Sequence, residues 1–146
     1  MKVLVMNGIN LFMLGIREPS KYGSRTLDSI NSDLKKWADG INDLEIDFFV
    51  TNFEGEFVEK LYASIGVYDG IVMNPGAWTH YSVGIRDAIA GCGIPCVEVH
   101  MTDINSREDF RKIQITSPVC VKQLSGYGED VYRLGVEELI SYLENK

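Results

Sequence analysis

An arginine and a tyrosine in one glycine-bounded segment are the first residues along the chain whose types suit chemistry. Arg17 and Tyr22 lie in Gly15–Gly23, after an apolar run, Val3–Met6, and an Asn/Gly-rich turn. This order predicts a surface loop that leaves the end of a buried strand. A permanent cation favours the deprotonated form of a neighbouring phenol, and a phenolate can act as a base. These two residues alone nevertheless favour a structural interpretation, in which Arg17 caps a neighbouring group and Tyr22 packs.

A carboxylate and an imidazole form a second candidate pair. Glu98 and His100 stand two residues apart at the end of an apolar run. This spacing on a strand points both side chains to the same face of a sheet. A carboxylate beside an imidazole fixes the tautomer of the ring and favours its protonated form, which suits a histidine that donates a proton during turnover. A strand-end histidine that pairs with a carboxylate only for packing fits the spacing equally well.

Two further groups suit the binding of a small anion. Asn74-Pro75-Gly76 predicts a tight turn that lifts Asn74 out of a strand, with His80 within reach, although turn chemistry alone explains the proline and the glycine. Arg107 and Arg111 are four residues apart. They share a face if their segment is helical, and guanidinium groups suit a carboxylate. For Arg107 the favoured interpretation is a solvated face that pairs with neighbouring acidic residues.

The composition limits the class of protein. At 146 residues the chain suits a single domain spanning residues 1–146, and its net charge of −7 disfavours a nucleic-acid partner. No apolar run approaches the roughly 20 residues that span a bilayer, and there is no signal-peptide layout, so a soluble cytoplasmic protein is expected. The three cysteines lack metal-ligand spacing and are expected to be buried thiols without a metal. No phosphate loop, dinucleotide fingerprint or serine nucleophile elbow occurs, which argues against nucleotide triphosphate chemistry and serine hydrolysis.

Five short apolar runs alternate with segments of helical periodicity, and these elements must position the candidate residues. The predicted strands are residues 2–6, 44–50, 70–73, 95–99 and 119–124. The predicted helices begin at Ser24 or Thr26, after the polar turn 52–55, at Ser82 and at Val131, and residues 105–111 are expected to hold a helical turn. This alternation predicts an α/β fold: a flavodoxin-like, doubly wound, five-stranded parallel sheet with helices on both faces.

Ligands of such sheets bind beyond the carboxyl ends of the strands. Both histidines of the chain fall on this edge, and their coincidence there with Arg17 and Tyr22 shifts the interpretation from packing towards a small-molecule site. The polar residues that follow the strands, and are expected to meet at this edge, are Asn7, Asn10, Asn52, Glu54, Asn74, His80, Glu98 and His100.

Several motifs, in their order and spacing, resemble the type II 3-dehydroquinate dehydratases, also called type II dehydroquinases. The resemblance covers essentially the whole chain and agrees with the fold that the periodicity predicts. The motifs are Asn7-Gly-Ile-Asn10-Leu, Leu14-Gly-x-Arg17-Glu-Pro-x-x-Tyr22-Gly, Asn52-x-Glu-Gly-Glu56, Asn74-Pro-Gly-Ala-x-Thr-His80-x-Ser82, Arg86-Asp87-Ala, Glu98-Val-His100 and Arg107-Glu-x-Phe-Arg111.

The resemblance implies dehydration of 3-dehydroquinate to 3-dehydroshikimate without a metal, a cofactor or a Schiff base. Tyr22, held as phenolate by Arg17, would remove the proton next to the substrate ketone, and Asn10 would stabilise the enolate through a bound water. His100, oriented by Glu98, would protonate the departing hydroxyl. The implied assembly is a homododecamer, a tetramer of trimers. The implied substrate-binding residues are Asn74, His80, Met101, Thr102, Arg111 and, from a neighbouring subunit, Asp87.

Three positions depart from the family pattern. Ile9 replaces a proline and should loosen the turn that presents Asn10, Trp78 enlarges an aromatic position, and Asp103 places an anion beside the predicted carboxylate pocket. An active enzyme with altered affinity is therefore expected. Two alternatives stay open: a related lyase or inactive paralogue that binds another polyhydroxy acid, and a signalling or flavin-binding module of the same fold. Against the second alternative, the chain lacks the phosphoacceptor aspartate that a signalling module needs and the phosphate loop that a flavin-binding module needs.

Overall fold

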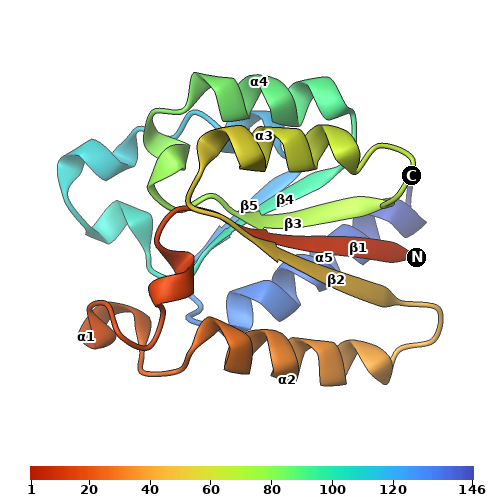
Figure 1. The fold of residues 1–146 in the computed structure, drawn as a ribbon, viewed down its shortest axis with the longest axis horizontal. Helices are drawn as coiled ribbons and strands as arrows, with labels where there is room; N and C mark the ends of the chain where they lie inside the picture. The colour runs from red at the N-terminus through yellow and green to blue at the C-terminus, as the bar shows by residue number, and fades with distance from the viewer.

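The computed structural model describes residues 1–146 as a five-stranded parallel sheet with helices on both faces (Figure 1). All four strand pairings are parallel, and the spatial order is β2-β1-β3-β4-β5. This is the flavodoxin-like order, so the predicted fold class is confirmed. The strands are β1 (Lys2–Asn7), β2 (Glu45–Val50), β3 (Gly70–Asn74), β4 (Cys96–His100) and β5 (Lys122–Ser125).

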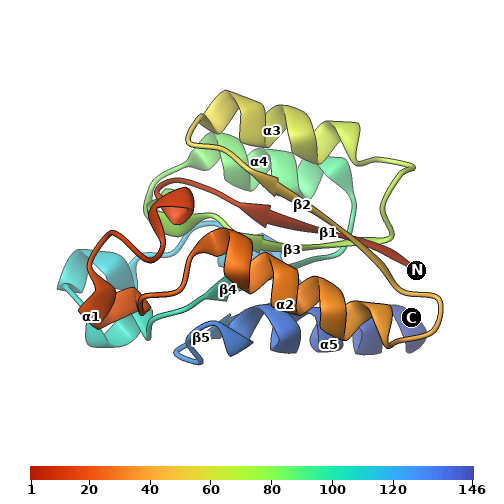
Figure 2. The same ribbon diagram turned by 60° about the horizontal axis from the view of Figure 1, so that its bottom comes forward.

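Helices cover both faces of the sheet (Figures 1 and 2), and an apolar core cluster lies on each face. Successive side chains of a strand point to opposite faces. In β1, Val3 and Val5 therefore belong to one core cluster, and Leu4 and Met6 belong to the other. Burial on both faces explains why the strands read as continuous apolar runs. The helices are α2 (Leu27–Asp39) and α5 (Asp130–Glu144) on the first face, and α3 (Glu54–Ala63) and α4 (Val83–Cys92) on the second.

Side-chain caps fix where two of these helices begin. The Thr26 hydroxyl accepts a hydrogen bond from the Ser29 amide at 3.2 Å, so Thr26 rather than Ser24 caps α2. The Ser82 hydroxyl accepts one from the Ile85 amide at 3.1 Å and caps α4, as predicted. Each cap satisfies a backbone N–H that has no partner within its own helix.

The fifth strand and residues 15–23 differ from their predicted structure. The fifth strand begins at Lys122 instead of residue 119, because Ser117–Val119 form a 3₁₀ turn that contains Pro118, which has no N–H for a strand ladder. Residues 15–23 were expected to be a loop and contain a four-residue helix, α1 (Pro19–Tyr22). Proline occupies the first position of this helix, where its missing N–H has no partner to lose.

The two ends of the sheet have different roles. Both chain termini lie at one end, and α1 lies at the other, beyond the carboxyl ends of the strands (Figure 1). No helix in the structure is both long enough and apolar enough to cross a bilayer. The candidate residues collect at the carboxyl end of the sheet.

Candidate active site

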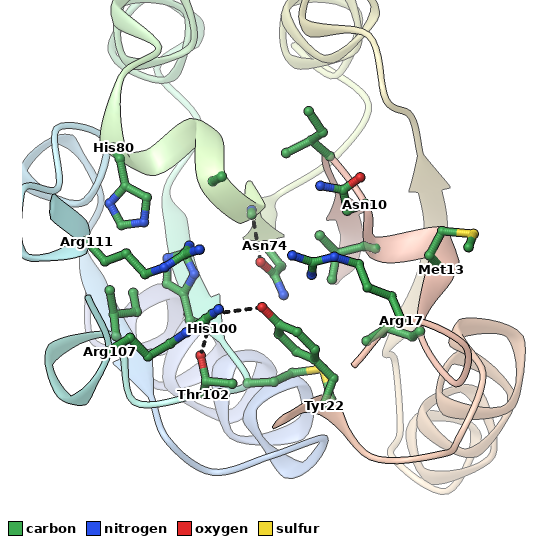
Figure 3. A pocket seen from close by; sticks show the side chains of 17 residues that line it. Asn10, Met13, Arg17, Tyr22, Asn74, His80, His100, Thr102, Arg107 and Arg111 are labelled. Carbon is green, nitrogen blue, oxygen red and sulfur yellow. Dashed lines mark hydrogen bonds between the residues drawn. The ribbon is translucent and has the colours of Figure 1, made fainter. Parts of the chain in front are cut away.

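A pocket lies at the carboxyl ends of the strands (Figure 3). It holds about 700 Å³ of space, including the part that is open to solvent. Three arginines and two histidines line it and no aspartate or glutamate does, although the whole chain has a net charge of −7. Such a lining favours an anionic ligand. The predicted site residues that line the pocket are Asn10, Arg17, Tyr22, Asn74, His80, His100, Met101, Thr102 and Arg111.

The Tyr22 side chain lies between two guanidinium groups (Figure 3). Arg107 Nη1 donates a hydrogen bond to the Tyr22 hydroxyl oxygen at 2.7 Å. Arg17 lies over the ring, with its Cζ 5.2 Å from the ring centroid. The cation in direct contact with the oxygen is therefore Arg107, whereas the sequence pointed to Arg17. A guanidinium donor on a phenol oxygen stabilises the charge that forms when the phenol loses its proton.

The prediction that Arg107 belongs to a solvated face is wrong. Its side chain is only 12% exposed and lines the pocket. Residues 105–111 hold helical turns, as expected, but these belong to two separate 3₁₀ elements, Ile104–Ser106 and Asp109–Lys112. Arg107 lies between them in an extended conformation, with φ −102° and ψ −161°. The side chain consequently reaches across the pocket to Tyr22. The available signal was the motif that Arg107 forms with Arg111 four residues later.

The α1 helix carries Tyr22 into the pocket. Glu18 before the helix and Gly23 after it have positive φ angles, of 43° and 83°, which reverse the chain on both sides. Such angles suit glycine and strain a glutamate. Glu18 forms ion pairs with Arg17 and Lys21, each at 3.2 Å. These ion pairs are exposed to solvent, so they hold the segment only weakly.

His100 has a buried carboxylate behind it. Glu98 is fully buried and outside the pocket, and its Oε2 lies 3.2 Å from His100 Nε2, without the alignment of a hydrogen bond. Thr116 Oγ1 donates to Glu98 Oε1, and Gln123 Nε2 donates to Glu98 Oε2 at 2.6 Å. Burial raises the pKa of Glu98, but its contacts with His100, Thr116 and Gln123 together leave this pKa below the ordinary value of 4.5. Glu98 is therefore ionised at neutral pH.

His80 reaches the pocket from the 3₁₀ turn Gly76–His80, which follows β3. Its Nδ1 lies 2.7 Å from the Ile113 carbonyl oxygen. A carbonyl can only accept, so Nδ1 carries the hydrogen and Nε2 keeps its lone pair. Burial lowers the pKa of His80 below its ordinary value of 6.5. The neutral ring can therefore accept a hydrogen bond from a ligand hydroxyl.

Two asparagines at the strand ends are fixed by their surroundings. Asn74 stays in β3 as its last residue, contrary to the prediction that the turn lifts it out. Its Nδ2 donates to the Tyr132 hydroxyl and its Oδ1 accepts from the Gly76 amide, both at 3.1 Å. The Asn10 amide donates to Asn52 Oδ1 at 2.8 Å, and its φ of 70° is left-handed. The exposed Asn10 side chain lies at the pocket rim.

Asp87 lies outside the pocket of the single chain. It is an exposed residue of α4. Its neighbour Arg86 points inward instead and donates to the Ile115 carbonyl at 2.7 Å. No group of three or more His, Cys, Asp or Glu side chains is arranged to hold a metal ion, and the three cysteines are free thiols. The polar side chains that line the pocket are those of arginine, histidine, tyrosine, asparagine and threonine.

The positions that depart from the family pattern affect the pocket unequally. Asp103 turns away from it, because its Oδ1 accepts a hydrogen bond from the Asn105 amide at 3.1 Å. Trp78 is 1% exposed and packs edge-on against Phe57, with ring centroids 5.4 Å apart, so it belongs to the core. Only Ile9 is part of the pocket lining.

The fold and the pocket define a class of protein: a flavodoxin-like α/β domain whose strand ends combine an arginine-bound tyrosine with a carboxylate-backed histidine. This arrangement suits acid–base chemistry on an anionic ligand. A family model described as “Dehydroquinase class II” matches residues 1–140. The chain belongs to this family, and the resemblance noted in the sequence is confirmed.

Relatives and solved structures are similar over nearly the whole chain. A protein named 3-dehydroquinate dehydratase from Geotalea daltonii is 45% identical over 144 residues, which is 99% of each chain. A protein of the same name from Trichodesmium erythraeum is 46% identical over 144 residues, covering 99% of this chain and 95% of its own. The crystal structure of type II dehydroquinase from Butyrivibrio crossotus has a TM-score of 0.93 at 39% identity and covers 96% of this chain and 97% of that one.

Proposed function

We propose that the protein dehydrates 3-dehydroquinate to 3-dehydroshikimate, with Tyr22 as the base and His100 as the acid. One observation carries the proposal: an Arg107 guanidinium lies 2.7 Å from the Tyr22 oxygen in a pocket that also holds His100 and contains no carboxylate. The names of the relatives support the choice of substrate. The reaction needs one base and one acid, and Tyr22 and His100 fill these roles in the proposal.

The first step is proton removal from the carbon next to the ketone. The Tyr22 phenolate takes the proton, and the electron pair of the C–H bond moves to the carbonyl oxygen and forms an enolate. Arg107 and Arg17 stabilise the phenolate before the step. Asn10 stabilises the enolate oxygen through a water, which needs little reorganisation because the Asn10 backbone is already fixed by Asn52.

The second step is loss of the hydroxyl on the neighbouring carbon. His100, backed by the Glu98 carboxylate, donates a proton to the departing oxygen. The enolate electrons then re-form the ketone and the C–O bond breaks, which gives a conjugated enone and water. Return of the proton from Tyr22 to His100 through solvent restores both groups.

Binding of the substrate uses the remaining polar groups of the pocket. Arg111 attracts the carboxylate, while Asn74 and His80 meet ring hydroxyls. The backbone at Met101 and Thr102 completes this set. No metal, cofactor or Schiff base takes part in the proposal.

The assembly that we propose is a cytoplasmic homododecamer, a tetramer of trimers, in which Asp87 of one subunit lies near the Tyr22 segment of the next. Support comes from exposed apolar side chains at the N-terminal ends of α3 and α4. Phe53, Tyr81 and Val83 are 57% to 67% exposed. The Ser82 hydroxyl between them donates to Glu54 at 2.8 Å and joins the two helices. Exposed apolar groups that gather in this way suit burial against another subunit.

The test is turnover by the purified protein. 3-Dehydroquinate should be converted to a product with the ultraviolet absorbance of a conjugated enone. The rate should be insensitive to a chelator and to borohydride, because neither a metal nor a Schiff base is involved. The absence of any absorbance change at about millimolar substrate would overturn the proposal and favour a related lyase for another polyhydroxy acid.

A further inference from the structure

The buried Glu98 carboxylate contacts more groups than His100. Gln123 is its direct neighbour in the register between β4 and β5, so the two side chains lie on one face of the sheet. Gln123 Nε2 donates one hydrogen to Glu98 Oε2 and the other to Gln114 Oε1, both at 2.6 Å. The reverse amide orientation would place oxygen against oxygen at both contacts. The network therefore fixes Gln123 as a donor to Glu98.

Thr116 occupies the other oxygen of the same carboxylate. It is fully buried, and its hydroxyl donates to Glu98 Oε1. The Thr79 hydroxyl lies 2.9 Å from Thr116 Oγ1 and 3.4 Å from Glu98 Oε2. Because the single hydrogen of Thr116 is used by Glu98, the single hydrogen of Thr79 is available either to Thr116 or to Glu98. Thr116 and Gln123 are thus both hydrogen-bond donors to Glu98, one on each carboxylate oxygen.

Glu98 and His100 can share a proton in two ways. In the ionised pair the proton is on the imidazole, and in the neutral pair it is on the carboxyl. Burial opposes the ionised pair because both charges lose hydration. The cations of Arg107 and Arg111 line the same pocket and repel an imidazolium, although the exposed Glu108 pairs with Arg111 at 2.7 Å and with Arg107 at 3.9 Å.

The remaining titratable groups that face the pair carry no compensating charge of their own. They are the neutral His80 ring and the Tyr22 phenol on the pocket side, and the Cys120 thiol near Glu98, whose pKa burial and Glu98 raise. The negative charge of a phenolate at Tyr22 would be compensated by Arg107, which contacts the Tyr22 oxygen directly. The donors on Glu98 remain as the local groups that favour the ionised pair, because they stabilise the anionic carboxylate more than the neutral carboxyl.

We propose that Gln123, together with Thr116, is a positioning residue that keeps the shared proton on His100, so that the ring enters each turnover as an imidazolium able to donate. The effect on turnover rests on the proposed function, in which His100 is the acid. The location of the proton does not depend on the proposed function, because it is a property of the chain without substrate.

The proton can be located by nitrogen NMR of histidine-labelled protein. The chain has only two histidines, so His80 serves as an internal reference. Gln123→Met removes the amide donors at similar side-chain volume. Lys122→Met is the matched control, since Lys122 is the preceding residue of β5 and points to the other face, where its ammonium lies 2.8 Å from Glu138.

The expected result is a shift of the His100 ring nitrogens from the imidazolium pattern towards the neutral pattern near pH 7 in Gln123→Met. His80 should not move in this variant, and neither ring should move in Lys122→Met. The kcat for 3-dehydroquinate should fall about tenfold in Gln123→Met, the usual scale for one lost hydrogen bond to a charge. Its KM should stay within about twofold.

A second variant keeps the proposal testable if Gln123→Met does not fold. Thr116→Val is isosteric and removes the donor on the other carboxylate oxygen, so it should move the His100 nitrogens in the same direction. Unchanged His100 nitrogens in folded Gln123→Met and Thr116→Val would overturn the proposal, even if kcat fell. If the unaltered protein does not convert 3-dehydroquinate, the proposed function fails by itself, because the nitrogen shifts are recorded without substrate.

Discussion

The two walls of the pocket are held in different ways. One, the strand wall, consists of Asn74 and His100 at the ends of β3 and β4, and each of these side chains has a buried partner, Tyr132 for Asn74 and Glu98 for His100. The other, the loop wall, consists of Arg17 and Tyr22 within residues 15–23. Its contacts are exposed ion pairs and one hydrogen bond from Arg107 across the pocket.

This difference separates stability from activity. Buried hydrogen bonds of the strand wall contribute to folding, because their loss leaves polar groups without partners. Exposed contacts of the loop wall contribute little to folding, so this wall is free to rearrange around a ligand. Changes in the loop wall should therefore reduce turnover without reducing stability, whereas changes behind the strand wall should reduce both.

Replacement of the base should have the largest effect. Tyr22→Phe removes the hydroxyl and should reduce kcat by about 10³-fold or more, the upper part of the range for a lost general base. The thermal unfolding midpoint should stay within about 1 °C, because the hydroxyl has a single partner, Arg107, which also contacts Thr102. Enone absorbance and a melting curve measure the two quantities. Retained turnover would rule out Tyr22 as the base, and a large drop in melting temperature would contradict the separation of the walls.

Removal of the cation on the Tyr22 oxygen should have the next largest effect. Arg107→Met should reduce kcat about 100-fold, since a hydrogen bond to a charged group is lost. Lys112→Met is the control, because Lys112 is a basic residue of the adjoining 3₁₀ turn whose side chain is 57% exposed. Steady-state kinetics of the two variants should therefore differ by about two orders of magnitude. Equal kcat values in the two variants would show that positive charge near the pocket, and not contact with Tyr22, determines the rate.

Behind the strand wall, neutralisation of the buried carboxylate should affect stability. Glu98→Gln should lower the free energy of unfolding by about 2 kcal/mol at pH 7, because an amide cannot accept from every donor around it. The folded pKa of Glu98 lies below its ordinary value of 4.5, so ionised Glu98 stabilises the fold above that pH, and the contribution disappears as the pH falls through the folded pKa. Urea unfolding at several pH values should show a steeper acid loss in the unaltered protein than in Glu98→Gln. Parallel pH profiles would show that Glu98 contributes no such linkage.

The smallest effect is expected at Asp103. Asp103→Asn keeps an acceptor for the Asn105 amide and removes a charge that points away from the pocket. The KM for 3-dehydroquinate should change less than about twofold, as expected for a charge outside the site. A several-fold fall in KM would show that the carboxylate turns into the pocket during binding.

Local patterns explain how much of this site the sequence could predict. Glu98 and His100 are two residues apart, so the period of a strand predicts that their side chains share a face. The order of strands and helices predicts the sheet edge at which both histidines lie. Family membership, too, could be predicted from the motifs. Arg107 was missed because its orientation depends on one extended residue between two turns. Gln123 was missed because its partner is 25 residues away and is met only through the register of β4 and β5.

Both pocket histidines depend on one short segment, residues 113–116, which has no regular secondary structure. The Ile113 carbonyl holds His80 and the Thr116 hydroxyl holds the carboxylate behind His100, while the Ile115 amide donates to the Thr79 carbonyl at 2.7 Å. Opening of this segment would release both rings in one event. The rate at which the Ile115 amide exchanges its hydrogen with deuterated water would therefore report how often the pocket loses its acid and its anchor together.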